Sequence, residues 1–300
     1  TGVKGVLCDI RRDLLLIPGV AIHMNRGVNE GVKLDPQKDT LPLLGGSQAE
    51  LKKLVAENAG VAPEDILSWD LYLYSRAQGT VFGAEKEFIA APRLDDLECV
   101  FAAAKAFLAG ENRENVTVLS LFDNEETGSL TRQGADSPFL SEVLERLSLS
   151  CGKSREEHLR AIASGFMLSA DNAHAVHPDS PEKSDPTNRC YLNGGVVVKH
   201  SPRYASDALT AGLFQRICQK AGVPVQVYYN NSKIPGGGTL GNLSGSHVAL
   251  PTVDIGLAQL SMHSPYETAG AKDLDYMVWA MQAFYESVIT QTGREEYAIQ

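Results

Sequence analysis

Two adjacent glutamates, Glu125 and Glu126, follow an apolar stretch in the sequence VTVLSLFDNEETGS, residues 116–129. Apolar side chains alternate over residues 116–122, which predicts a half-buried strand with the acids in the loop after its carboxyl end. Neighbouring residues in such a loop point in different directions. One carboxylate could therefore hold a metal ion while the other moves a proton beside it. The alternative is a solvated acidic turn, and the pair alone does not decide between the two.

Further carboxylates and an imidazole follow other apolar stretches. Asp95 lies in RLDD, Asp171 lies in SADNAH after the apolar run GFMLS, and His263 lies in SMHS after TVDIGLAQL. Because sites in open α/β sheets gather beyond the carboxyl ends of strands, we expect these side chains to lie close together. Such oxygen and nitrogen ligands suit zinc, manganese or cobalt, and two ions can share a bridging carboxylate. Hydrolysis of an amide is the chemistry that a metal pair of this kind supports.

Each of these residues also has a purely structural interpretation. Asp95-x-x-Glu98 fits the pattern of a helix capping box. Asp171 could close a turn, and His263 could be a core histidine with satisfied hydrogen bonds. Local patterns leave these alternatives open.

A glycine-rich stretch, PGGGTLG at residues 235–241, could in principle cradle a phosphate. It lacks the GK[ST] ending of a P-loop and does not have the G-x-G-x-x-G pattern, which argues against nucleotide binding. We interpret it as a loop that approaches a site closely.

The elements that position these residues alternate between strands and helices after about residue 85. Short apolar runs predict strands in VVVK, VQVYY and TVDIGLAQL. Helices with one apolar face are predicted after FIAAPRLDD, over RYASDALTAGLFQRICQKAG and near the end of the chain. This alternation is typical of a layered α/β domain with a central mixed sheet flanked by helices.

The beginning of the chain has a different pattern. GVLCDI, LLLIPGVAIHM and LSWDLYLYS are predicted as strands, with the turn-rich stretch NEGVKLDPQKD between them. We therefore predict a smaller strand-rich domain over residues 1–85 and the α/β domain over residues 86–300, with the boundary near Gly83.

Composition limits the classes of partner. The 300 residues include 37 acids and 27 bases, and the net charge of −10 argues against binding to nucleic acid or to an anionic membrane. Five scattered cysteines fit neither a disulfide framework nor a zinc knuckle. No apolar run reaches the roughly 18 residues that a membrane span needs. We expect a cytoplasmic protein.

Taken in order, the motifs resemble those of the M18 family of metallo-aminopeptidases, most closely the aspartyl aminopeptidases. The resemblance implies a zinc-dependent enzyme with two metal ions that removes N-terminal residues, preferentially Asp or Glu, from peptides. Manganese or cobalt could replace zinc. The matching strings cover nearly the whole chain: IPGVAIHMNRGVNEG, LPLLG, PRLDD, DNEETGS, SADNAHAVHP, RYASDA, GGGTLG and VDIGLAQLSMHS.

The same resemblance implies a role for each acid at the site. Asp95 is expected to bridge the two metals, with Glu126 as a ligand of one, and Asp171 and His263 as ligands of the other. Glu125 is expected to be the general base that takes a proton from the attacking water and delivers it to the leaving amine.

Substrate contacts and assembly are implied as well. His23 is expected to reach the active site of a neighbouring subunit and to stabilise the oxyanion there. Lys199 and Tyr204 resemble pocket residues that receive an acidic side chain, and we assign Gly238 to the same substrate-binding region. The strand-rich domain would act as lid and dimer contact, with a homodimer as the minimal unit and a dodecamer as the assembly.

One motif of the family has no match in this sequence. Family chains carry an upstream HTDSP-like motif, whose histidine is expected to complete the coordination of the Glu126 metal. We expect either that upstream residues are missing from the sequence, or that the chain is a truncated homologue of weak or no activity acting as an assembly component. An M18 enzyme that prefers neutral or basic N-terminal residues is a further alternative. A glycoside hydrolase is less suited, because its two acids lie about 5–9.5 Å apart across a cleft.

Overall fold

The structure is a computed structural model that describes residues 2–234 and 236–300. The chain divides into two compact units, Thr1–Arg76 and Ala77–Gln300. Residues 77–85, which the sequence places in the smaller domain, belong to the second unit, since strand β1 (Thr80–Phe82) pairs with β2 (Phe88–Ala91). Pro235 of the glycine-rich stretch lies outside the described residues.

The first unit consists of short helices and loops. Helix α1 begins after Asp35, whose carboxylate accepts the backbone N–H of Gln37 at 3.0 Å. Helix α2 ends at Gly60, whose φ of 68° lies in the left-handed region that glycine adopts without strain. The helices of this unit are η1 (Val28–Glu30), α1 (Pro36–Asp39), α2 (Leu51–Ala59) and η2 (Pro63–Asp65).

The strands predicted for the first unit do not form among residues 2–76, where one isolated bridge joins Leu16 to Leu43. Apolar side chains of these segments stay exposed, with Leu7 at 96% and Tyr72 at 82%. A strand needs a partner for its backbone groups and a covered face for its side chains, and alternation in the sequence supplies neither. The strand-rich description of the first segment therefore does not match its described residues.

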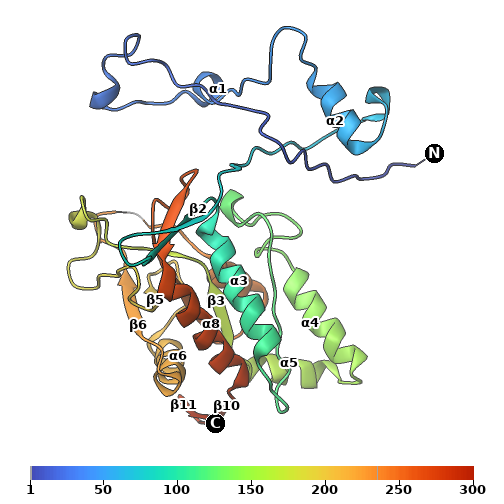
Figure 1. Cartoon of the computed structure of the whole chain (residues 1–300). Coiled ribbons are helices and arrows are strands. Elements are labelled where there is room, and N and C mark those ends of the chain that lie inside the picture. The colour runs from blue at the N-terminus through green and yellow to red at the C-terminus, as the bar shows by residue number, and fades with distance from the viewer. Residues whose placement is uncertain (1, 235) are drawn as a thin grey trace. The chain divides into compact units, whose positions relative to one another are not determined.

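A four-stranded mixed sheet lies at the centre of the second unit, and it confirms the predicted α/β class (Figure 1). Valines alternate between its two faces, because Val196 and Val198 pack into one core cluster and Val197 packs into another. The middle pair, β7 and β5, is antiparallel, and the outer pairs are parallel. The strand order is β3 (Met167–Ala170), β7 (Thr252–Gly256), β5 (Val196–His200) and β6 (Val225–Tyr229).

A five-stranded sheet continues from the first one. The chain passes from sheet to sheet twice, from β3 to β4 through Asp171 and Asn172, and from β7 to β8 through Leu257. Both pairs of strands are parallel, so the two passages run side by side, and we call these three residues the seam. The strand order is β1, β2, β9 (Glu267–Gly270), β8 (Ala258–Leu260) and β4 (Ala173–His174).

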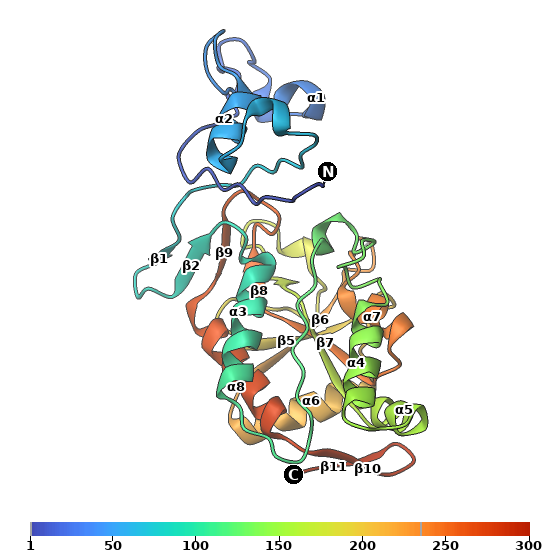
Figure 2. The ribbon, with the colours of Figure 1, turned by 90° about the vertical axis from the view of Figure 1, so that its right-hand side faces the viewer.

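Helices cover both faces of the four-stranded sheet. Helices α3 and α8 lie side by side on one face in both views, and α6 packs with them into the larger core cluster (Figures 1 and 2). Helix α7 contacts β3 and β7 and lies with α4 on the other side of the sheet (Figure 2). The helices are α3 (Leu94–Ala109), α4 (Phe139–Ser150), α5 (Arg155–Ala163), α6 (Ala208–Ala221), α7 (Leu240–His247) and α8 (Ala271–Glu286).

Residues 116–122 do not form the strand that their alternation predicts, although they lead directly to the two glutamates. Val116 and Leu121 are exposed, and no described strand pairs with this segment. A short 3-10 helix, η3 (Glu125–Thr127), follows it, while η4 (Pro181–Lys183) and a hairpin of β10 (Ile289–Gly293) and β11 (Glu296–Ile299) complete the unit. Among the described residues, no helix combines the length and the apolar character that crossing a membrane requires.

Candidate metal centre

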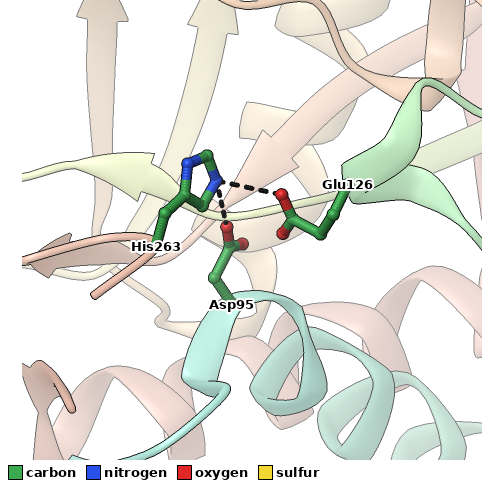
Figure 3. A group of neighbouring side chains, drawn as sticks. All are labelled: Asp95, Glu126 and His263. Carbon is green, nitrogen blue, oxygen red and sulfur yellow. Dashed lines mark ion pairs between the residues drawn. The ribbon is translucent and has the colours of Figure 1, made fainter. Parts of the chain in front are cut away.

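Three side chains from distant parts of the chain converge on one point (Figure 3). Asp95 lies at the start of α3, Glu126 lies in η3, and His263 lies in the loop between β8 and β9. The Nε2 atom of His263 is 3.2 Å from Asp95 Oδ2 and 3.1 Å from Glu126 Oε2. Two carboxylates and an imidazole at such distances are a donor set suited to zinc.

A second group of acids lies on the buried side of the first. Asp95, Asp96 and Asp171 each offer a carboxylate oxygen, and the three oxygens lie within 4.8 Å of one another. Asp171 comes from the seam, where its backbone N–H donates to the Ile255 carbonyl at 3.1 Å. Asp95 belongs to both groups, which is the arrangement that a bridging carboxylate requires.

The grouping of the ligands differs from the one expected from the sequence. His263 was expected to act with Asp171, but it lies with Glu126 against Asp95. The reason is that the Asp171 carboxylate is held from the buried side by the ammonium group of Lys199, at 3.1 Å. The His263 side chain is more exposed than that of Asp171, and it contacts the carboxylates of Asp95 and Glu126.

Backbone conformation places these ligands in unusual positions. His263 itself has φ of 66°, Asn124 before the two glutamates has φ of 59°, and Arg93 before Asp95 also has φ of 59°. Left-handed conformations are uncommon for residues other than glycine and cost folding free energy. The capping box that Asp95 and Glu98 could form is absent, since the Glu98 carboxylate has no hydrogen-bond partner among the described residues.

Burial and like charge make this centre electrostatically unfavourable without a cation. Burial, followed by the charges of Asp171 and Glu126, raises the pKa of Asp95 to about 8. Burial also raises the pKa of Asp96 well above its ordinary value. The Oδ1 atoms of Asp95 and Asp96 lack a hydrogen-bond partner among the residues that the structure describes. These unpaired oxygens, beside an imidazole, fit a divalent metal ion.

Glu125 is placed differently from its neighbour Glu126. It is half-buried, and burial raises its pKa to about 7, with further contributions from the charges of Asp171 and Glu126. It does not belong to either group of candidate ligands. A carboxyl group with a pKa near neutral pH can both accept and release a proton.

Lys199 does not offer its ammonium group to a substrate, in contrast to the expectation from the sequence. Its side chain is buried, and Nζ donates to the Asp171 carbonyl at 2.7 Å, to Asp171 Oδ2 at 3.1 Å and to the Asn172 carbonyl at 3.1 Å. These contacts use all three donors of an ammonium group. The reason is burial, because a cation within the protein needs partners there, and the seam provides them.

The remaining candidates for substrate contact and catalysis are Tyr204, Gly238 and His23. Tyr204 has its ring 5.2 Å from Lys199 Nζ, which places it next to the buried side of the site. Gly238 is exposed in the loop before α7, with open space where a side chain would be. His23 is exposed at a turn of the first unit, where the Met24 N–H donates to the Ala21 carbonyl.

Three residues at the centre were not identified from the sequence. Asp96 adds a carboxylate to the second group, Asn172 donates to the Leu94 carbonyl at 3.1 Å, and Glu267 accepts the backbone N–H of Asp95 at 2.9 Å. The doublet in RLDD was a signal for Asp96. Asn172 and Glu267 form hydrogen bonds with backbone groups. Neither their residue types nor their spacing in the sequence predicts these bonds.

The fold and the donor set together define a class, that of layered α/β proteins with a candidate metal centre. A family model described as "Aminopeptidase I zinc metalloprotease (M18)" matches residues 3–285. The chain belongs to the M18 family, as the motifs in the sequence predict, and zinc is the metal by which this family is described.

Individual relatives agree with the family model. The chain is 44% identical over 287 residues to the probable M18 family aminopeptidase 2 of Clostridium acetobutylicum, covering 93% of this chain and 66% of that relative. The crystal structure of prApe1 is similar with a TM-score of 0.85 and 30% identity, over 95% of this chain and 66% of that one. The S. cerevisiae mApe1 dodecamer has a TM-score of 0.77 and 28% identity, over 95% and 65% respectively. The chain thus spans just under two thirds of the length of these relatives.

Proposed function

We propose that this protein is a zinc-dependent aminopeptidase that hydrolyses the N-terminal residue of peptides. The observation that carries the proposal is the position of His263 Nε2, which lies 3.2 Å from the Asp95 carboxylate and 3.1 Å from the Glu126 carboxylate. Membership of the M18 family, and the names of the relatives, support the class of reaction.

Two metal positions share Asp95 in this proposal. Asp95, Glu126 and His263 would hold one zinc ion, and Asp95 and Asp171, with Asp96 beside them, would hold the second. When bound, zinc polarises the scissile carbonyl and lowers the pKa of a water molecule. Lys199 keeps the Asp171 carboxylate in place from the buried side.

Glu125 is the proton carrier of the reaction. Its half-buried carboxylate stands beside the ligands, and its pKa of about 7 suits both uptake and release of a proton near neutral pH. It accepts a proton from the attacking water and then transfers it to the nitrogen of the leaving amine. His23, from the first unit of a second copy of the chain, stabilises the negative charge that develops on the carbonyl oxygen.

The proposal also includes a substrate preference, for peptides with an acidic N-terminal residue. It is supported by the resemblance to aspartyl aminopeptidases alone, because Lys199 is committed to Asp171. Tyr204 and the loop around Gly238 remain the proposed substrate contacts. A homodimer, and from it a dodecamer, is proposed as the assembly, since mApe1 is described as a dodecamer.

Elemental analysis and anilide hydrolysis test the proposal together. We expect zinc in the purified protein and hydrolysis of aminoacyl p-nitroanilides, with activity lost after treatment with a chelator and restored by added zinc. The Asp and Glu anilides should be cleaved faster than the Leu and Lys anilides. Purified protein that takes up no zinc would contradict the proposal, and it would favour an assembly component. Zinc-dependent cleavage of the Leu or Lys anilide in preference to Asp and Glu would overturn only the acidic preference.

A further inference from the structure

Glu267 is a buried acid that lies between two of the candidate metal ligands. It is the first residue of β9, a strand in the middle of the five-stranded sheet, and its exposed fraction is 2%. Carboxylates are seldom buried so completely unless they are paired or accept several hydrogen bonds. The contacts of Glu267 therefore indicate what the side chain does.

Both oxygens of Glu267 accept backbone hydrogen bonds from ligand residues. Oε1 accepts the N–H of His263 at 2.6 Å, and Oε2 accepts the N–H of Asp95 at 2.9 Å. Hydrogen bonds to an ionised acceptor are among the stronger ones in proteins. One side chain thus ties together the backbones of the loop that carries His263 and the start of α3.

Both tied positions have an irregular backbone. His263 has φ of 66°, a left-handed conformation that is uncommon for histidine and that persists only where surrounding contacts hold it. Asp95 has φ of −82° and ψ of 115°, which is not helical although it lies within the bounds of α3. Both residues donate their backbone N–H to Glu267 in these conformations, and their side chains turn toward the same point.

We propose that Glu267 is the positioning residue of the metal centre, which fixes the backbones of Asp95 and His263 at the separation that zinc binding requires. This inference rests on the proposed function, because it assumes that the two residues bind zinc. Partners that orient metal ligands in this way change metal affinity about 10- to 100-fold when they are mutated.

Replacing Glu267 by glutamine tests the positioning role while nearly preserving the shape of the side chain. Glutamine has nearly the same size, but it offers one acceptor oxygen and one NH₂ donor. The NH₂ group would face a backbone N–H donor, so either Asp95 or His263 loses its hydrogen bond. The affinity for zinc should fall because one ligand is no longer held.

The chain provides a matched control at Asp273. Its carboxylate is also buried, with an exposed fraction of 0%, and it also accepts one backbone N–H on each oxygen. The donors are Asn193, at 2.6 Å, and Gly195, at 2.8 Å, and neither is a candidate ligand. Asp273→Asn therefore removes the same kind of buried contact without touching the metal centre.

The experiment compares the unaltered chain with its Glu267→Gln and Asp273→Asn variants. Zinc affinity is measured by competition with a chromophoric chelator, and the ligand geometry is read from the visible absorption spectrum of the cobalt-loaded proteins. We expect zinc binding to Glu267→Gln to be about 10- to 100-fold weaker, with an altered cobalt spectrum. We expect Asp273→Asn to keep the wild-type spectrum and affinity, even where its thermal stability falls.

Three outcomes would overturn the inference. The first is wild-type zinc affinity and an unchanged cobalt spectrum in Glu267→Gln, and the second is an equal loss of affinity in Asp273→Asn. If Glu267→Gln does not fold, as judged by circular dichroism, Glu267→Asp takes its place, because it keeps both acceptors but has a shorter reach. The third outcome that would overturn the inference is a wild-type zinc affinity in Glu267→Asp.

Failure of the proposed function has a different signature. Wild-type protein that binds no zinc rejects the proposed function and this inference with it. Wild-type protein that binds zinc and cleaves anilides, alongside a normal zinc affinity in Glu267→Gln, rejects only the role of Glu267.

Discussion

Replacing Lys199 by methionine should destabilise the metal-free protein strongly. Methionine has a similar length but no charge, so the substitution removes three hydrogen bonds to the seam residues Asp171 and Asn172. The Asp171 carboxylate, whose side chain is 15% exposed, would then face Asp95 and Asp96 without a cation beside it.

The size of this effect follows from the burial of the pair. Breaking a buried ion pair by removing one partner costs about 3–5 kcal/mol, because an uncompensated charge remains inside the protein. The exposed pair of Lys153 and Glu157, at 4.0 Å, provides the comparison. Lys153→Met should cost far less stability than Lys199→Met, since exposed ion pairs contribute little.

The free energy of unfolding of both variants is measured by urea denaturation followed by circular dichroism. A chelator is present, so that metal binding does not contribute to stability. The reasoning is refuted if Lys199→Met loses no more stability than Lys153→Met. A double variant adds a second test, because Asp171→Asn removes the carboxylate that Lys199 compensates. Lys199→Met combined with Asp171→Asn should be less destabilised than the sum of the two single variants.

Three more predictions follow from the same structure. Glu125→Gln should retain zinc but reduce turnover of anilides about 100-fold or more, as expected for loss of a general base, and near-normal turnover would exclude that role. His23→Ala should lower turnover without lowering zinc content, and an unchanged rate would reject its action in a neighbouring site. Burial raises the pKa of Asp273 to about 6, so the stability contributed by its protonated form is present below about pH 4 and is lost as the pH rises through about 6. The difference in unfolding free energy between wild type and Asp273→Asn, measured across this range, should follow that change, and a pH-independent difference would contradict it.

Strands with partners were predictable from the sequence, and those without partners were not. β5 (Val196–His200) and β6 (Val225–Tyr229) coincide with the apolar runs VVVK and VQVYY, because their neighbours in the sheet bury them. Residues 116–122 have a clear alternation but no partner strand among the described residues. Alternation reports which face of a strand can be buried, and it does not report whether another strand is there to cover it.

The candidate ligands were predictable as residue types, but their grouping was not. Asp95, Glu126 and His263 follow apolar stretches, and the fold brings both carboxylates within hydrogen-bonding distance of the His263 imidazole. The grouping of His263 with Glu126 depends on Lys199, which holds Asp171 on the buried side. That contact joins β5 to the seam, and no local pattern encodes it.

The burial of Glu267 and Lys199 could not be predicted from their residue types. An acid at the start of a strand resembles a solvent-facing residue, and a lysine after VVV resembles the end of a strand at the surface. Both side chains are buried instead, because each has backbone groups or a carboxylate to bind. Burial of a charge depends on partners supplied by tertiary structure.

The seam between the two sheets restricts where the length of this chain can change. One residue inserted after Asp171 would shift β4 by one position against β8 and turn every following side chain of that strand to the opposite face. Residues 177–179, in the loop that follows β4, are exposed and belong to no described strand, and tolerance to insertion is greatest at exposed loop positions. Insertions should therefore be tolerated at residues 177–179, whereas the passage from β3 to β4 should keep its present length.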